Sequence, residues 1–235
     1  MLSHGGVIGA SGVSAGGGGS ITVDAATVAR WTNNVSQGAS STSASFTPPN
    51  NSLLVVFVSI GTTSTTMTMN VSGGGLTWTK RAEHFEADSG GYDGYVGVWT
   101  APVTTGASMT ISCSRSAGTV TTGHTTAKCY IITGHDTAAP IDQVGEGHGS
   151  GSPYNPTLFT ATAVGRALYG AIEWNVAGTI SSSDTEDAVN AVNSGDWSAL
   201  SAYKASDHAA GSVSGNLQSS GSPTWNWVAV AIKVA

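Results

Sequence analysis

Charge is scarce in this sequence. Only 9% of its 235 residues are Asp, Glu, Lys or Arg, whereas ordinary globular domains carry roughly a quarter. The eight Lys plus Arg residues form no basic run, and the formal net charge is −6. Nucleic-acid binding needs clustered cations that pair with phosphates, so the composition predicts no nucleic-acid partner.

Long apolar runs are also missing. The longest, Leu53 to Ile60, has the length of a strand and falls short of the roughly 18 residues that span a bilayer. We therefore expect no membrane insertion. The start of the chain has neither the basic beginning nor the apolar middle of a secretory signal. We expect synthesis in the cytoplasm, followed by release through lysis or a route other than general secretion if the protein leaves the cell.

Two cysteines, Cys113 and Cys129, are too few for a disulfide scaffold. Strand alternation places Cys113 on one face with Ile111, and Cys129 on one face with Ile131. The pattern favours two buried thiols over a cross-strand disulfide, and metal binding is the third alternative.

Glycine is abundant at the start of the chain, which opens with "MLSHGGVIGASGVSAGGGGSI". This composition offers high backbone entropy and little apolar area, so residues 1–20 are predicted to form a flexible arm. The pentapeptide "GGVIG" (Gly5, Gly6, Val7, Ile8, Gly9) holds an apolar pair between glycines. Such a pair suits insertion into a neighbour's groove or addition to a sheet edge.

From Ile21 onward the pattern is that of β-strands. We count about ten to twelve short strands separated by Gly, Pro, Asn and Asp clusters, which predicts an all-β, jelly-roll-like antiparallel sandwich. The stretch from Leu53 to Ile60 is predicted to be buried on both faces. Only residues 184–194 offer a helical turn, and residues 145–156 form the best internal break, interpreted as a long loop. Residues 21–235 are predicted to be one domain.

Two stretches match catalytic motifs in sequence but lack the structural context that these motifs need. Gly12 to Gly16 match G-x-S-x-G, and Ser201 to Lys204 match S-x-x-K. The first lies in glycine-rich coil and the second in a β pattern, whereas these motifs act at the start of a helix. Glu83, Glu86, Glu173 and Glu186 are available to a glycosidase, but nothing places two of them across a cleft. We expect no catalytic residues and no enzyme.

Two clusters offer metal ligands. The first contains His135, Asp136, Asp142, Glu146 and His148, and the second contains Glu86, Asp88 and Asp93. Turn chemistry explains the first, since Asp136 and Pro140 suit a turn after a strand, and a solvated hairpin loop explains the second. We favour these interpretations over a Ca²⁺ or Zn²⁺ site and expect neither metal nor cofactor.

Aromatic residues give the remaining indication of function. Five tryptophans fall within strand patterns and are predicted to pack in the sandwich: Trp31, Trp78, Trp99, Trp174 and Trp227. Four further aromatics lie near loops: Tyr92, Tyr154, Trp197 and Trp225. These four either cover the ends of the sheets or present their rings to a sugar. They are the candidate glycan contacts.

Six phrases follow one another along the chain: "NSLLVVFVSIG", "GLTWTKRAE", "VGVWTAPV", "TISCSRS", "YIITGHDTAAPIDQVG" and "WNWVAVAIKVA". In this order they resemble the β-sandwich domains of tailed-phage virion proteins and bacterial surface proteins. The resemblance covers residues 45–235. "GGVIG" is similar to the N-terminal tag of certain small phage structural proteins, although no proline-and-tryptophan stretch follows it here.

The resemblance implies a non-enzymatic structural protein on the surface of a tailed-phage virion. It would be held to other virion proteins by its arm and would project a β-sandwich as a decoration, fibre or receptor-binding module. We expect a homo-oligomer, with a trimer as the first choice, and a host surface glycan as a further partner. The alternatives are a free lectin-like carbohydrate-binding module and, ranked last, a glycan-degrading enzyme.

Overall fold

The computed structural model describes residues 19–33, 40–62, 67–87, 93–117, 124–174, 179–192, 197–221 and 224–235. These ranges contain strands, turns and bends and no helix, and they confirm the predicted all-β class with its antiparallel sheets. None of them holds a helix of the length and apolarity that crossing a membrane requires. The jelly-roll connectivity remains a prediction.

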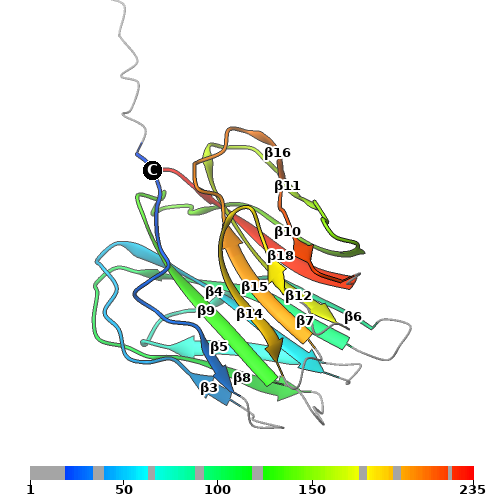
Figure 1. Ribbon diagram of the computed structural model, residues 1–235. Coiled ribbons are helices and arrows are strands. Elements are labelled where there is room, and N and C mark those ends of the chain that lie inside the picture. The colour runs from blue at the N-terminus through cyan, green and yellow to red at the C-terminus, as the bar shows by residue number, and fades with distance from the viewer. Residues whose placement is uncertain are drawn as a thin grey trace, which may run out of the picture.

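Two large sheets face each other (Figure 1). The first has the order β1-β9-β4-β7-β6, with β2 also paired to β9, and the second has the order β10-β18-β12-β15-β14. The first contains β1 (Thr22–Asp24), β2 (Trp31–Asn33), β4 (Ser52–Thr62), β6 (Thr79–Ala87), β7 (Asp93–Val103) and β9 (His124–Thr133). The second contains β10 (Ile141–Ser150), β12 (Gly165–Trp174), β14 (Thr185–Val192), β15 (Trp197–Tyr203) and β18 (Thr224–Lys233).

Smaller ladders complete the fold. A three-stranded sheet has the order β3-β8-β5, and two two-stranded ladders pair β11 with β16 and β13 with β17. Their bounds are β3 (Ser40–Thr42), β5 (Thr68–Gly73), β8 (Ile111–Ala117), β11 (Thr157–Ala161), β13 (Ile180–Ser181), β16 (Gly211–Ser214) and β17 (Gln218–Ser219). The strands outnumber the expected ten to twelve because several have only two or three residues, too few to show a period.

Three apolar cores separate these layers. The central core lies between the two large sheets and includes Phe57, Val98, Ile172 and Val230. The first flanking core lies under the three-stranded sheet, with Ile111 and Trp99 among its members. The second flanking core lies beneath the two short ladders and includes Leu158, Tyr169 and Trp227.

Strand β4 confirms the predicted two-sided burial. Leu54 and Val56 belong to the first flanking core, whereas Leu53 and Val55 belong to the central core. Each of these four side chains is 0% exposed. Consecutive strand residues point to opposite faces, so an uninterrupted apolar run is what a strand between two apolar layers requires.

Both cysteines are free and buried in the first flanking core, as the favoured interpretation predicted. Cys113 lies on β8 and Cys129 on β9. Burial raises the pKa of both thiols, which keeps them protonated and unreactive.

Residues 145–150 correct the predicted internal break, because they continue β10 and pair with β18. Their glycines make room for bulky neighbours. A Cβ atom would lie 2.9 Å from Trp227 at Gly147 and 2.2 Å from Tyr154 at Gly149. Glycine here permits a close approach of rings to a strand and does not mark a loop.

The one stretch that offered a helical turn, residues 184–194, forms a strand instead, because residues 185–192 are β14. The strand pairs with β15 in an antiparallel register and forms one edge of the second large sheet. Pairing with a sheet edge here outweighs the weak local helical preference of the segment.

Aromatic rings in the central core also depend on glycine. Trp197 is 1% exposed, and a Cβ atom at Gly61 of β4 would lie 2.2 Å from Trp197 Cδ1. We predict that Gly61→Ala lowers the free energy of unfolding by about 1–3 kcal/mol, the usual cost of overpacking a core. Denaturant unfolding followed by circular dichroism measures this change.

Gly19→Ala is the matched control, because a Cβ atom there would meet nothing closer than 3.8 Å. Its midpoint should stay within experimental error of the wild type. Equal stability of the Gly61→Ala protein and the wild type would show that the ring does not lie against this strand.

Candidate functional site

An open gap of about 370 Å³ lies between β6 and β10, lined by Lys80, Arg81, Ile141, Asp142, Gln143 and Val144. Strand β6 is an edge of the first large sheet, and β10 is an edge of the second. Both strands are irregular at this level. The register of β6 shifts between Lys80 and Ala82, and that of β10 shifts between Ile141 and Val144.

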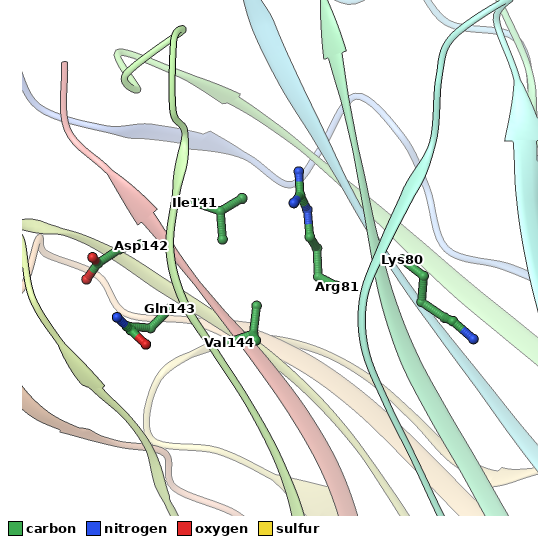
Figure 2. Close-up of a pocket in the computed structure, with 6 residues that line it drawn as sticks. All are labelled: Lys80, Arg81, Ile141, Asp142, Gln143 and Val144. Atoms are coloured by element: carbon green, nitrogen blue, oxygen red, sulfur yellow. The ribbon is translucent and has the colours of Figure 1, made fainter.

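These register shifts, which are typical of β-bulges, determine where the side chains point. In Figure 2, Arg81 lies in the gap, and Ile141 and Val144 point toward it from β10. Asp142 and Gln143 point to the other side of β10, while Lys80 points away from the gap. The gap therefore combines one cation with two aliphatic side chains.

Arg81 is held by one hydrogen bond. Its Nε donates to Thr100 Oγ1 at 2.7 Å, and Thr100 is 0% exposed. Partial burial lowers the pKa of the Arg81 guanidinium, although arginine stays charged in proteins. Within the described part of the chain, no acceptor hydrogen-bonds to its two terminal nitrogens. The fork of the guanidinium is thus oriented and available.

Lys80, by contrast, is already paired. Its ammonium group forms a salt bridge with Glu83, and the hydroxyl of Tyr95 donates to the second oxygen of Glu83 at 2.8 Å. Burial and the neighbouring Glu83 carboxylate raise the pKa of Tyr95, so the hydroxyl remains a donor. The net positive charge facing the gap is therefore that of Arg81.

Asp142 does not neutralise Arg81. Its carboxylate accepts hydrogen bonds from Thr162 N at 2.7 Å, from Thr162 Oγ1 and from Ala163 N at 3.2 Å. These contacts hold the carboxylate against the turn after β11. Farther along the same two strands, the rings of His84 on β6 and His148 on β10 stack with centroids 5.6 Å apart.

The structure buries two of the four candidate glycan contacts. Trp197 lies in the central core and Trp225 in the second flanking core, with exposures of 1% and 0%. A ring buried to this extent presents no face to a sugar, so the prediction is wrong for these two residues. Tyr154 is half-buried with its hydroxyl bonded to His148 O at 2.8 Å, and Tyr92 lies outside the described residues.

Asp136, from the first candidate metal cluster, makes the turn contacts that the sequence predicts. Asp136 Oδ1 accepts hydrogen bonds from Ala138 N at 2.9 Å and Ala139 N at 3.0 Å, and these bonds lower the pKa of Asp136. His135 is buried, which lowers its pKa, whereas Glu146 and His148 are exposed. No group of three metal-ligating side chains occurs in the ranges given above. Asp88 and the side chains of Glu86 and Asp93 lie outside the described residues.

The catalytic motifs also separate in space. Ser201 is 1% exposed, and its hydroxyl accepts hydrogen bonds from Arg30 and Tyr130. Lys204 instead pairs with Asp184 at 2.9 Å, so it does not activate Ser201. The motif from Gly12 to Gly16 and the attachment residues Gly5, Gly6, Val7, Ile8 and Gly9 lie outside the described residues.

Of the four glutamates available to a glycosidase, Glu173 has the most unusual environment. It lies on β12 beside Ser198 of β15 and Trp225 of β18, and it is 0% exposed. Neither carboxylate oxygen has a partner at good hydrogen-bond geometry among the described residues, and the hydroxyl of Ser219 offers only a partial interaction that opposes the effect of burial. Burial raises the pKa of Glu173 to about 7. Glu83 lies on the opposite side of the central core, so the two form no catalytic pair.

Comparison of the chain with protein-family models, with curated proteins and with solved structures finds no match. No family is assigned on these grounds. The likeness to phage virion domains therefore remains an expectation. The gap around Arg81 was not predicted from the sequence, because edge positions and bulges leave no periodic signal. The one available indication was the adjacent pair of cations, Lys80 and Arg81, within a strand pattern.

We predict that stability falls as pH rises because of Glu173. Its carboxyl loses its proton near the ordinary value of 4.5 in the unfolded chain but near 7 in the folded one. Between these values the folded state binds more protons, so the free energy of unfolding decreases with pH, by up to about 3 kcal/mol in total. Denaturant titrations at pH 4.5, 6 and 8 measure the decrease.

Glu173→Gln should remove this slope and be more stable than the wild type at pH 8, because the amide stays neutral. Exposed Glu146→Gln serves as the matched control and should retain the wild-type slope. The same pH dependence in the wild type and in Glu173→Gln would contradict the assignment. The difference in free energy of unfolding between the wild type and Glu173→Gln at each pH cancels the contributions of the aspartates and His135.

Proposed function

We propose that this protein is a non-enzymatic structural component of a tailed-phage virion, displayed on the particle surface. In this proposal, residues 1–18 attach the chain to other virion proteins and the β-sandwich projects outward as a decoration, fibre or receptor-binding module. Two observations support the proposal. The first is the order of the sequence phrases that resemble virion domains, and the second is that the arm joins one end of the body while strand ends from both large sheets lie at the other end.

One end of the body carries the point where the arm joins. Ile21 N donates to Asp207 Oδ2 at 3.3 Å, and Ile21 O accepts from Arg166 Nη2 at 2.9 Å. Arg166 and Asp207 form a salt bridge of 2.8 Å, with Arg166 6% exposed. Ala235 lies at the same end, where its N–H donates to Gly134 O at 3.1 Å. The junction between arm and body is therefore rigidly held.

The opposite end carries strand ends from both large sheets (Figure 1). Registers place Thr62, Asp93 and His124 together in the first sheet, far from the pairing of Leu53 with Ile132. Trp174 and Thr224 pair at the corresponding end of the second sheet. A body held at one end, with the ends of strands from both large sheets at the other, suits a module that projects from a surface, and this arrangement carries the proposal.

Multiple copies would strengthen both attachment and target binding. In a symmetric assembly, several weak contacts act together at a high effective concentration, and this raises the overall avidity. We therefore propose a homo-oligomer, with a trimer as the first choice. A host surface glycan is the proposed target. The second candidate function, a free carbohydrate-binding module, is favoured by the gap at Arg81 and would not need residues 1–18.

Deletion of residues 1–18 should leave the body folded and abolish incorporation into particles. The body that the structure describes begins at Gly19. Circular dichroism checks folding, and immunoblotting of purified particles from a complementation assay measures incorporation. Incorporation of the truncated chain at the wild-type level would overturn the proposed role of the arm.

A double variant tests whether "GGVIG" is the part of the arm that attaches to the particle. Val7→Asp with Ile8→Asp should reduce incorporation as strongly as the deletion, because charged side chains cannot enter an apolar groove without a large desolvation cost. Val13→Asp in the same arm is the matched control and should incorporate normally.

A further inference from the structure

We propose that the gap between β6 and β10 binds a sugar acid, a pyranose ring that carries a carboxylate, with Arg81 holding the carboxylate. This inference does not depend on attachment to a virion. A free protein with this gap would bind the same ligand.

The guanidinium of Arg81 fits a carboxylate in shape. Its Nε is fixed by the bond to buried Thr100 Oγ1, so the two terminal nitrogens extend into the gap as an oriented fork. A planar fork of this kind pairs with a carboxylate through two parallel hydrogen bonds. Because the side chain is already ordered, little conformational entropy is lost on binding.

The charge in the gap favours a monoanion. Arg81 provides one positive charge, Lys80 is paired with Glu83, and the Asp142 carboxylate is bonded to the turn at Thr162. A phosphate would bring about two negative charges to a protein whose formal net charge is −6. A carboxylate brings one, which a single arginine balances.

The rest of the gap suits a sugar ring. Ile141 and Val144 face Arg81, and Val144 is 43% exposed, one of the two large apolar side chains in the described residues that lie open to solvent. They offer an apolar surface to the C–H face of a ring. As edge strands, β6 and β10 also present backbone N–H and C=O groups that no other strand of the described ranges pairs with, and these can pair with hydroxyls.

The bulges argue against a peptide in the same place. Addition of a strand needs a regular edge, and both edges are shifted in register at this level. The volume of about 370 Å³ lies at the small end of the roughly 300–1,000 Å³ typical of small-molecule sites. One or two sugar rings are therefore the appropriate size.

The test is an NMR titration of the full chain with three probes: glucuronate, glucose and cyclohexanecarboxylate. Glucose lacks the carboxylate, and cyclohexanecarboxylate keeps the ring and carboxylate but lacks the hydroxyls. We expect glucuronate to shift the Arg81 Nε–Hε resonance and to bind at least about tenfold more tightly than either other probe, as expected for losing a charge-assisted bond or several hydroxyl contacts.

Variants locate the site. Arg81→Gln should weaken glucuronate binding by about tenfold or more, and Arg81→Lys should fall between it and the wild type because the charge stays and the fork is lost. Arg115→Gln on β8, outside the gap, should bind as the wild type does. Circular dichroism confirms folding, and the Arg81 resonance of the wild type decides the result if Arg81→Gln unfolds.

Four results would overturn the inference. Equal binding of glucose and glucuronate would exclude the carboxylate as the recognised group. Binding of cyclohexanecarboxylate as tight as that of glucuronate would make the site one for apolar acids. An unmoved Arg81 resonance, or unchanged binding by Arg81→Gln, would place any sugar elsewhere. None of these results depends on whether the protein enters a particle.

Discussion

The structure depends on strands that are buried on both of their faces. β4, β12 and β18 each lie between two apolar layers, so almost every residue along them is apolar or small. A shift of one residue would exchange the two faces of such a strand. A large ring on one strand therefore needs a glycine on the strand that packs against it, as Trp197 of β15 needs Gly61 of β4 in the facing sheet. Little room remains for charge, which agrees with its scarcity in the sequence.

Charged groups that do enter the body are consequently informative. The Arg166 and Asp207 pair is bonded to Ile21 and fixes the start of the body. Glu173 has no such charged partner, and burial raises its pKa to about 7, so it is mostly neutral below that pH. Arg81 lies between these cases, with one bond to Thr100 and a free fork in an open gap. Of the three, Arg81 alone is placed to meet a ligand from solvent.

Much of the fold follows from residue patterns, and the site does not. The apolar run from Leu53 to Ile60 predicts a doubly buried strand, and alternation around Cys113 and Cys129 predicts buried thiols, because both depend on local periodicity. The glycines of residues 145–150 suggest a loop, yet they serve contacts with Trp227 and Tyr154 that are distant in sequence. Trp197 and Trp225 lie near predicted loops in the sequence, and the contacts that bury them are likewise made by residues distant in sequence. Arg81 faces Val144 only because two bulged edges meet in the folded protein.

We propose that the body is a module displayed from a phage particle. Peptide mass spectrometry of purified phage particles, with this chain quantified against the major capsid protein, is the decisive measurement. We predict that the chain is present, at high copy if it decorates the capsid and at a few copies if it belongs to a fibre or tail tip. Its absence from intact particles would contradict the claim and leave a free glycan-binding module.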